Sequence, residues 1–191
     1  AEDYQQVILS ILEDIKSLNA LSNKLLLLAQ SSSEEREQSM TPVRIDELLW
    51  QAKDDLMRHS PTFTVNIDLD ENLDDETKLT IRGDEQLLRT AVMNLMENGC
   101  KYSADKSVRV FIQGSRFGIS LVFTDKGVGI PQSDIPNIFE PFYRGTNTKS
   151  IRGHGIGLPM VRGIVKAHGG TIQLTSVEGK GTVVTIHFPI V

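Results

Sequence analysis

Glycine is concentrated in one part of this chain, and its placement there restricts the folds that the chain can adopt. Eleven of the 15 glycines lie between Gly127 and Gly181. Gly127 and Gly129 directly follow an apolar, strand-like segment, whereas the cluster from Gly153 to Gly157 directly precedes a helix-like segment. Glycines at such junctions let the backbone approach a phosphate, whose charge is favoured by the N-terminus of the following helix. Taken alone, the pattern is equally typical of a flexible surface loop.

The charge of the chain is distributed unevenly around those glycines. With 20 basic and 25 acidic residues, the net charge is -5, which argues against a nucleic acid partner because such partners need clustered Lys and Arg. From Pro141 to Val177, however, no acidic residue occurs. The same stretch carries five basic residues: Arg144, Lys149, Arg152, Arg162 and Lys166. A local basic field around glycines indicates a polyphosphate ligand; a chance cluster of solvated side chains is the alternative.

The apolar pattern predicts an α+β domain over residues 42–191. Alternation predicts strands near residues 63–69, 108–112, 119–123, 171–176 and 182–188, most of them joined as hairpins, with shorter strands at 43–45 and 79–81. Helical spacing predicts helices over residues 45–59, 85–96 and 156–168, with Asp84 as an N-cap. Hairpin strands with separate helices favour a two-layer α/β sandwich.

Residues 4–29 predict a long helix that is unlike the rest of the chain. Their apolar residues recur in steps of four and three, as in a heptad seam, without Gly or Pro. A stripe this wide needs partner helices, and residues 31–41 are polar and read as a linker. We therefore expect an incomplete helical bundle at 1–30, a linker at 31–41 and the α/β domain at 42–191.

Membrane segments and disulfides are not expected. The longest apolar run, Leu25 to Ala29, has five residues, whereas a membrane-spanning helix needs about 20. No signal peptide is visible at Ala1. The single cysteine, Cys100, cannot form an intramolecular disulfide and is expected to be buried on a helix, which fits a reducing compartment.

Besides the glycines and the basic stretch, two asparagines also indicate a ligand site. Asn94 and Asn98 are four residues apart and share one face of a helix, close to Lys101 and Tyr102. Carboxamide oxygens can ligate Mg²⁺, which retains waters and takes phosphate oxygens as further ligands. Internal capping or pairing of the two side chains is the alternative.

These asparagines belong to four sequence boxes that occur in order. The others are Asp125-x-Gly127-x-Gly129, Phe139-Glu140-Pro141-Phe142-Tyr143-Arg144 and Gly153-x-Gly155-x-Gly157. Together they resemble the N, G1, F and G2 boxes of bacterial sensor histidine kinases, in the ATPase superfamily shared with gyrase B, Hsp90 and MutL. The resemblance covers about residues 42–191. It implies the Bergerat fold and an ATP-dependent protein-histidine kinase with Mg-ATP as its substrate.

The resemblance also implies roles at the phosphate end of the site. Asn98 would coordinate Mg²⁺ through its carbonyl oxygen, with Asn94 supporting the same face. Lys101 would contact phosphate and Tyr102 would line the nucleotide site. Arg144 would lie near the γ-phosphate, so that Asn98, Lys101 and Arg144 form the implied catalytic set.

At the adenine end, Asp125 would accept a hydrogen bond from the adenine amino group, because a carboxylate only accepts. Gly127 and Gly129 would let the backbone approach the base, and Thr182 would reach it through water. Glycines 153, 155 and 157 would hinge a lid that Phe139 and Phe142 pack. The implied ATP-binding set is completed by Ile130, Phe142, Gly153, His154, Gly155, Ile156, Gly157 and Leu158.

One position distinguishes kinases from hydrolases within the superfamily. Relatives that hydrolyse ATP carry a Glu, the general base for water, where this chain has Asn94. Glu97 is adjacent to Asn98 and is expected to point about 100° away from it, so it cannot substitute for that missing base. A histidine kinase is therefore favoured over a hydrolase. A serine kinase of the anti-sigma type also lacks the base, and the N-terminal helix favours the histidine kinase; a degenerate module that only docks partners is a further alternative.

None of the four histidines, His59, His154, His168 and His187, resembles the acceptor, which the family places in a His-Glu or His-Asp box on the first bundle helix. His168 ends a helix, where a positive charge would be favoured, and is expected to be structural. The acceptor is therefore expected to precede this chain. The resemblance further implies homodimerisation through the bundle, phosphoryl relay to a response regulator aspartate, and a cytoplasmic location in a parent protein anchored in the inner membrane.

Overall fold

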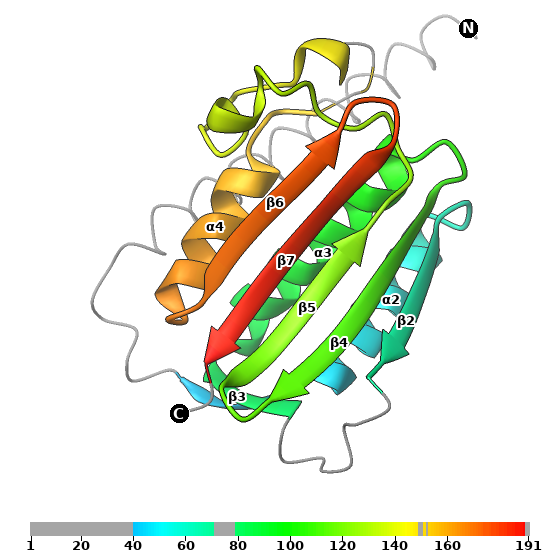
Figure 1. The fold of residues 1–191 in the computed structure, drawn as a ribbon. Helices are drawn as coiled ribbons and strands as arrows, with labels where there is room; N and C mark the ends of the chain where they lie inside the picture. The colour runs from blue at the N-terminus through cyan, green and yellow to red at the C-terminus, as the bar shows by residue number, and fades with distance from the viewer. Residues whose placement is uncertain (1–39, 71–78, 149–150, 152, 190–191) are drawn as a thin grey trace, which may run out of the picture.

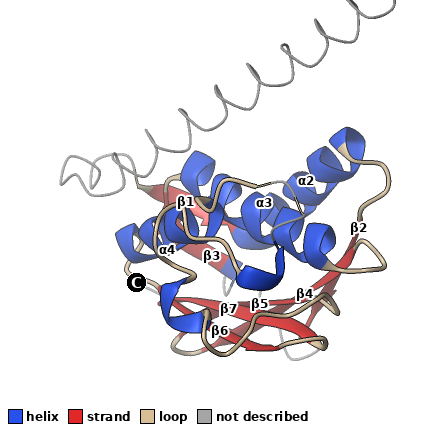
Figure 2. Cartoon of the chain, turned by 90° about the horizontal axis from the view of Figure 1, so that it is seen from above, coloured by secondary structure: helices blue, strands red, loops and turns tan. Residues whose placement is uncertain are grey.

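The computed structural model describes residues 40–70, 79–148, 151 and 153–189. The helix expected at 4–29 and most of the predicted linker lie outside these residues. Within them, a five-stranded sheet is covered on one face by three α-helices (Figures 1 and 2). The predicted two-layer α+β architecture is therefore confirmed.

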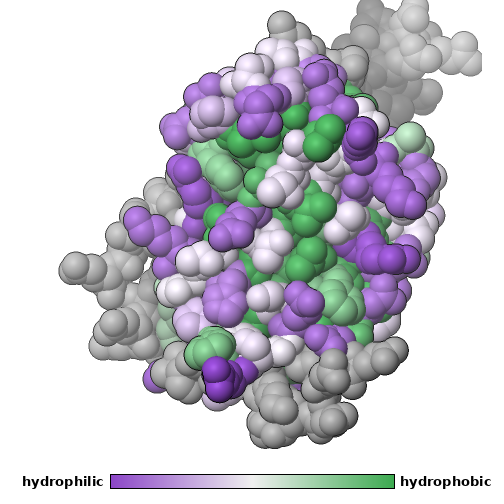
Figure 3. Space-filling view, viewed as in Figure 1, coloured by the Kyte–Doolittle hydropathy of each residue, from purple (hydrophilic) through white to green (hydrophobic). Residues whose placement is uncertain are grey.

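The main sheet has the strand order β2 (Thr64–Leu69), β4 (Ser107–Ser115), β5 (Gly118–Thr124), β7 (Gly181–Pro189) and β6 (Thr171–Val177). Neighbouring strands are antiparallel except β2 and β4, which are parallel. The predicted hairpin between β4 and β5 is confirmed. The face of the sheet without helices mixes polar and apolar side chains (Figure 3), as expected for a sheet with one solvated face.

The helices α2 (Ile45–His59), α3 (Glu85–Tyr102) and α4 (Gly157–Ala167) form the second layer, with α3 between the other two. A separate antiparallel pair, β1 (Thr41–Arg44) and β3 (Thr80–Gly83), lies beside them. Two sequence expectations are wrong in detail: Ile45 begins α2 and is not in the strand, and Leu69 is 40% exposed at the end of β2 although Val65 and Ile67 are buried. None of the helices within the described residues has the length and apolarity to span a bilayer.

The start of α3 is fixed by two hydrogen bonds at Asp84. As predicted, the Asp84 side chain caps the helix, accepting from the backbone N–H of Leu87 at 3.0 Å. The backbone N–H of Asp84 donates to Nε2 of His168 at 3.0 Å, and Nδ1 of His168 lies 2.7 Å from the carbonyl oxygen of Ile164. Because Nε2 accepts, Nδ1 carries the proton. His168 is thus a neutral structural link between α4 and α3, in agreement with its expected structural role.

Farther along α3, Gly99 allows the helix to lie directly on β4. A Cβ at Gly99 would be 2.4 Å from Cγ2 of Val108 and 2.7 Å from its Cβ. Such distances require the helix or the strand to move. The glycine is therefore needed for helix–sheet packing, although glycine is a poor helix former.

We predict that Gly99→Ala destabilises the domain by about 1 to 3 kcal/mol through overpacking, despite the higher helix propensity of alanine. Urea denaturation would measure the effect. The double variant Gly99→Ala/Val108→Ala should lose less unfolding free energy than the sum of the losses in the two single variants, because removing the Val108 methyl groups makes room. Additive losses would contradict the packing explanation.

Cys100 follows Gly99 and is fully buried, as predicted. Its Sγ lies 3.5 Å from the carbonyl oxygen of Thr64. Burial raises the pKa of the Cys100 thiol to about 11. Because the thiolate is the reactive form, the folded protein should protect this thiol.

We predict that a thiol reagent at neutral pH labels native Cys100 at least about 100-fold more slowly than the urea-unfolded chain, from the shift of the thiolate equilibrium alone. Mass spectrometry over time would follow the labelling, and the single cysteine makes the signal unambiguous. Equal rates in the two states would contradict this burial.

Candidate nucleotide-binding site

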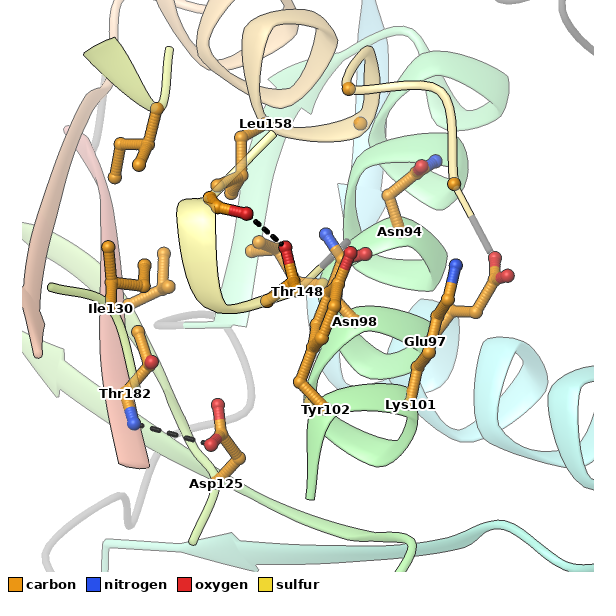
Figure 4. Close-up of a pocket in the computed structure, with 18 of the residues that line it drawn as sticks. Asn94, Glu97, Asn98, Lys101, Tyr102, Asp125, Ile130, Thr148, Leu158 and Thr182 are labelled. Atoms are coloured by element: carbon orange, nitrogen blue, oxygen red, sulfur yellow. Dashed lines mark hydrogen bonds between the residues drawn. The ribbon is translucent and has the colours of Figure 1, made fainter. Parts of the chain in front are cut away.

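A cavity of about 640 Å³ lies where α3, the start of α4, the end of β5 and the loop between β5 and α4 meet (Figure 4). This volume is typical of small-molecule and cofactor sites. Most of the residues implied by the sequence resemblance line it: Asn94, Asn98, Lys101, Tyr102, Asp125, Gly129, Ile130, Arg144, Gly153, His154, Gly155, Ile156, Gly157, Leu158 and Thr182. Residues far apart in the chain thus share one cavity.

The asparagine pair lies on the face of α3 that borders the cavity, as their spacing predicts (Figure 4). Asn94 is 8% exposed, and its Nδ2 donates to the backbone carbonyl of Thr90 at 2.8 Å. This bond leaves Oδ1 facing the start of α4. A Cβ at Gly157 would be 3.2 Å from Oδ1 of Asn94 and 3.4 Å from Nδ2 of Asn98. Gly157 therefore lets α4 begin against both carboxamides.

The start of α4 favours the binding of phosphate on one side of the cavity. The N-cap residue, Ile156, makes no side-chain hydrogen bond to the helix, so the N–H groups of the first turn have no side-chain cap. Gly153 lies near α3, since a Cβ there would be 3.2 Å from Nζ of Lys101. An uncapped N-terminus beside an ammonium group suits a phosphate.

The residues that line the cavity also fit Mg²⁺ held together with a nucleotide. Among the described residues, no group of three or more His, Cys, Asp or Glu could hold a metal. Mg²⁺ does not need such a cage, because it commonly takes one or two protein oxygens, phosphate oxygens and water. The half-buried carboxamide of Asn98 provides a suitable oxygen at the cavity wall.

Asp125 follows the end of β5, away from Asn94 in the close-up (Figure 4). Its Oδ1 accepts from the backbone N–H groups of Gly127 at 2.8 Å and Thr182 at 3.3 Å. Burial raises the pKa of the Asp125 carboxyl, and these two hydrogen bonds oppose the rise. Within the described residues no donor contacts Oδ2, so this oxygen can accept from a ligand. An amino group such as that of adenine is a matching donor.

The glycines after Asp125 have a packing role that was not expected. A Cβ at Gly127 would be 2.3 Å from the carbonyl oxygen of Tyr102, and Gly127 does not line the cavity. Gly129 does line it, at φ +64°, but its Cβ would be 2.1 Å from the carbonyl oxygen of Val177. Both glycines therefore allow the chain to pack against other backbone segments, and Gly129 also borders the cavity, as expected.

Two aromatic residues depart from the expected lid packing. Phe142 is 61% exposed at φ +67° and lies outside the cavity lining, although its backbone N–H donates to the carbonyl of Gly155 at 2.8 Å. Phe139 lies under the guanidinium of Arg162, 5.2 Å from the ring centroid. The expected contribution of the Phe142 side chain to the nucleotide site is therefore not seen.

Of two charged groups at the cavity, Glu97 differs from expectation and Arg144 lies where it was expected. Glu97 borders the cavity as an exposed residue, on the side where Figure 4 shows Lys101, although its helical position predicted that it would point away. Arg144 lines the cavity, and its Nη2 donates to the backbone carbonyls of Thr148 at 3.0 Å and Ile151 at 2.6 Å. Burial raises the pKa of Tyr102, and the Arg144 charge partly offsets this effect.

Sequence reasoning did not identify the residues that hold the loop beside the cavity. Asp134, only 3% exposed, accepts from the Tyr143 hydroxyl at 3.0 Å and from both the N–H and the hydroxyl of Thr146, at 2.7 and 2.9 Å. The N–H of Thr146 is the main cause that lowers the Asp134 pKa. Asp before Ile135-Pro136 would be read as a helix cap, so its long-range partners have no local signal. Apolar wall residues were also missed: Phe123, Ile138, Leu174 and Val184.

This arrangement agrees with comparisons to known proteins. Residues 83–191 match the family described as histidine kinase-, DNA gyrase B- and HSP90-like ATPases. The chain belongs to this ATPase family. The ordered boxes noted in the sequence thus lie within the part of the chain that matches the family.

Relatives of this ATPase domain include sensor kinases. The sensor-like histidine kinase SenX3 of Mycobacterium tuberculosis is 33% identical over 183 residues, covering 94% of this chain and 43% of SenX3. The phosphate regulon sensor protein PhoR of Pseudomonas aeruginosa is 31% identical over 171 residues, covering 88% of this chain and 38% of PhoR. This chain therefore spans less than half the length of these relatives.

Solved structures show the same fold. The mycobacterial sensor histidine kinase MprB aligns with a TM-score of 0.67 at 27% identity, over 78% of this chain and 97% of that one. Full-length ShkA aligns with a TM-score of 0.73 at 24% identity, over 93% of this chain and 36% of that one.

We predict that Asp125→Asn weakens adenine nucleotide binding by about 10- to 100-fold, because a charged acceptor is lost and an amide donor can face the adenine amino group. Protonation of the Asp125 carboxyl should weaken nucleotide binding in the same way, because the charge is lost. Since burial raises the Asp125 pKa, affinity should begin to fall at a higher pH than an ordinary Asp would produce as the solution is acidified.

Calorimetric titration with ADP at several pH values would test this. The Asp125→Asn variant serves as the control, because the nucleotide's own protonation remains while that of residue 125 is absent. Parallel pH profiles for the two proteins would show that Asp125 does not contact the base.

Proposed function

We propose that this chain is the catalytic, ATP-binding region of a two-component sensor histidine kinase. It binds Mg-ATP and transfers the γ-phosphoryl group to a histidine that lies outside this chain. The main support is a cavity of nucleotide size whose wall includes Asn94 and Asn98. The position of Asn94 has no carboxylate that could activate water. Relatives named sensor histidine kinases support this assignment.

Under this proposal, Asp125 binds the adenine amino group through Oδ2, while Oδ1 remains bonded to the protein backbone. Lys101 and the start of α4 bind the phosphates, and Asn98 provides an oxygen to Mg²⁺. The metal would neutralise phosphate charge when bound. These contacts orient the γ-phosphoryl group and exclude other geometries.

Phosphoryl transfer requires charge stabilisation more than covalent help from the protein. Lys101 and Arg144 provide positive charge at the cavity. Arg144 bonds the carbonyls of Thr148 and Ile151, and a guanidinium has five N–H donors, so it can hold the loop and still face phosphate. A neutral imidazole nitrogen is the proposed nucleophile, which needs no base comparable to that of a hydrolase.

None of the four histidines stands in an acceptor box, and three of them contact other groups of the protein. His168 uses both ring nitrogens inside the protein. His187 on β7 lies 3.1 Å from the Ser120 hydroxyl, and His59 on α2 lies 2.7 Å from the Asp55 carbonyl. His154 borders the cavity but is exposed on its loop.

Several wider features belong to the same proposal. Residues 1–30 would be the second helix of a bundle that forms in a homodimer, 31–41 a linker, and 42–191 the catalytic domain. The phosphorylated histidine would pass its phosphoryl group to an aspartate of a response regulator receiver domain. The whole would work in the cytoplasm, beneath a membrane-anchored sensor.

We predict that the purified chain binds a non-hydrolysable ATP analogue in a Mg²⁺-dependent manner but does not label itself with [γ-³²P]ATP. An added bundle domain that carries a His-Glu or His-Asp acceptor box should acquire acid-labile label. Asn98→Asp should abolish this labelling, because an added carboxylate beside the phosphates disturbs Mg-ATP binding.

The matched control is Asn66→Ala, an exposed asparagine on β2 away from the cavity lining, which should leave labelling unchanged. Steady-state phosphate release should stay near background. Self-labelling would show that an acceptor is present in the chain, and rapid phosphate release that Glu97→Gln removes would favour a hydrolase.

A further inference from the structure

We propose that Asn147 is a positioning residue that holds one wall of the cavity against the base-binding end and thereby contributes to adenine selectivity. The inference rests on the proposed nucleotide function and deepens it. Asn147 lies in the short helical turn η4 (Thr146–Thr148), and both Asn147 and Thr148 line the cavity. The turn belongs to the loop that precedes α4.

Hydrogen bonds join Asn147 directly to the segment after Asp125. Its Nδ2 donates to the carbonyl of Gly129 at 3.1 Å and lies 3.5 Å from the carbonyl of Val128. Because both partners are carbonyl oxygens, the amide orientation is settled: Nδ2 must face them. Val128 and Gly129 themselves border the cavity, so this contact joins two of its walls.

The segment that Asn147 holds is already fixed from three other sides. The N–H of Val128 donates to the carbonyl of Tyr102 at 3.2 Å, and the N–H of Gly179 donates to the carbonyl of Val128 at 2.8 Å. The N–H of Ile130 donates to the Ser176 hydroxyl at 2.8 Å. The segment is therefore the rigid partner, and the η4 turn is the part whose position depends on Asn147.

The other anchor of the η4 turn does not define its distance from the base. Asp134 bonds the N–H and the hydroxyl of Thr146, but Asp134 belongs to the same loop. It shapes the turn internally. Asn147 places the shaped turn against Gly129, in the segment that follows Asp125.

The Oδ1 atom of Asn147 indicates that this side chain does more than stabilise the fold. Its Oδ1 is buried and has no hydrogen-bond partner within the described residues. A buried unmet acceptor is unfavourable, so the side chain combines one favourable and one unfavourable group. Removing the whole amide should consequently change the cavity more than the stability of the fold.

The test compares Asn147→Ala, Asn147→Asp and the matched control Asn66→Ala. Calorimetry would measure the affinity of each protein for ADP, a non-hydrolysable ATP analogue and the corresponding GTP analogue. Asn147→Ala should weaken ADP and the ATP analogue by the same factor, about two- to tenfold for one neutral hydrogen bond. It should also reduce the ratio of adenine to guanine affinity. Asn147→Asp should lose more nucleotide affinity than Asn147→Ala, because its carboxylate would face two carbonyl oxygens.

The melting temperature of Asn147→Ala should stay close to that of the unchanged chain, and Asn66→Ala should match the unchanged chain in every measurement. An unaltered base ratio in both Asn147 variants, or a loss confined to the triphosphate, would overturn the positioning role while leaving the proposed function intact. Absence of Mg²⁺-dependent nucleotide binding by the unchanged chain would overturn both.

Discussion

One oxygen atom, Oδ1 of Asp125, joins parts of the chain on which the base end of the cavity depends. It accepts backbone hydrogen bonds from Gly127 in the following turn and from Thr182 at the start of β7. Ser176 continues the connection: its hydroxyl donates to the carbonyl of Gly181, accepts from Ile130, and bonds the Thr182 hydroxyl. A carboxylate that accepts only can satisfy the backbone with one oxygen and a ligand with the other. Structure and recognition thus share one side chain.

A second constraint is the position of α3, which places the asparagine pair. The helix begins at the Asp84 cap and the neutral His168, and it approaches β4 closely where Gly99 has no side chain. Asn94 and Asn98 face the cavity because their neighbours on the opposite side of α3 are buried against the sheet. The phosphate end is then completed by α4, whose first residue, Gly157, lies against both carboxamides.

Local periodicity was sufficient to predict most of the elements, including the β4–β5 hairpin, the Asp84 cap and the shared face of Asn94 and Asn98. These features depend on side chains a few residues apart. The parallel pairing of β2 with β4 could not be predicted this way, because it joins segments separated by a helix. The exposed Leu69 shows the same limit, since alternation does not reveal where a strand leaves the core.

The candidate site was predictable where a residue's chemistry alone was informative, and not where tertiary packing decides. Asp125 is an acceptor wherever it lies, so the presence of an acceptor at the cavity could be anticipated. Gly127 and Gly129 were both expected at the ligand; Gly129 does border the cavity, but Gly127 does not, and both are required by the backbones of Val177 and Tyr102. Asn147 has partners 18 residues away, and nothing in its neighbouring sequence identifies them.

The replacement of a carboxylate by Asn94 has two physical consequences that point to the same chemistry. A carboxylate at this buried position would stand beside bound phosphates and repel them, whereas a carboxamide adds no charge. The amide also cannot accept a proton from water at neutral pH, because a carboxamide is far too weak a base; the Asn94 nitrogen only donates, to the Thr90 carbonyl. Glu97 is exposed at the cavity border and remains solvated, so it is a weak substitute for a buried base. A cavity that binds phosphates without activating water leaves transfer to a nucleophile that needs no base, and an incoming neutral imidazole meets that requirement.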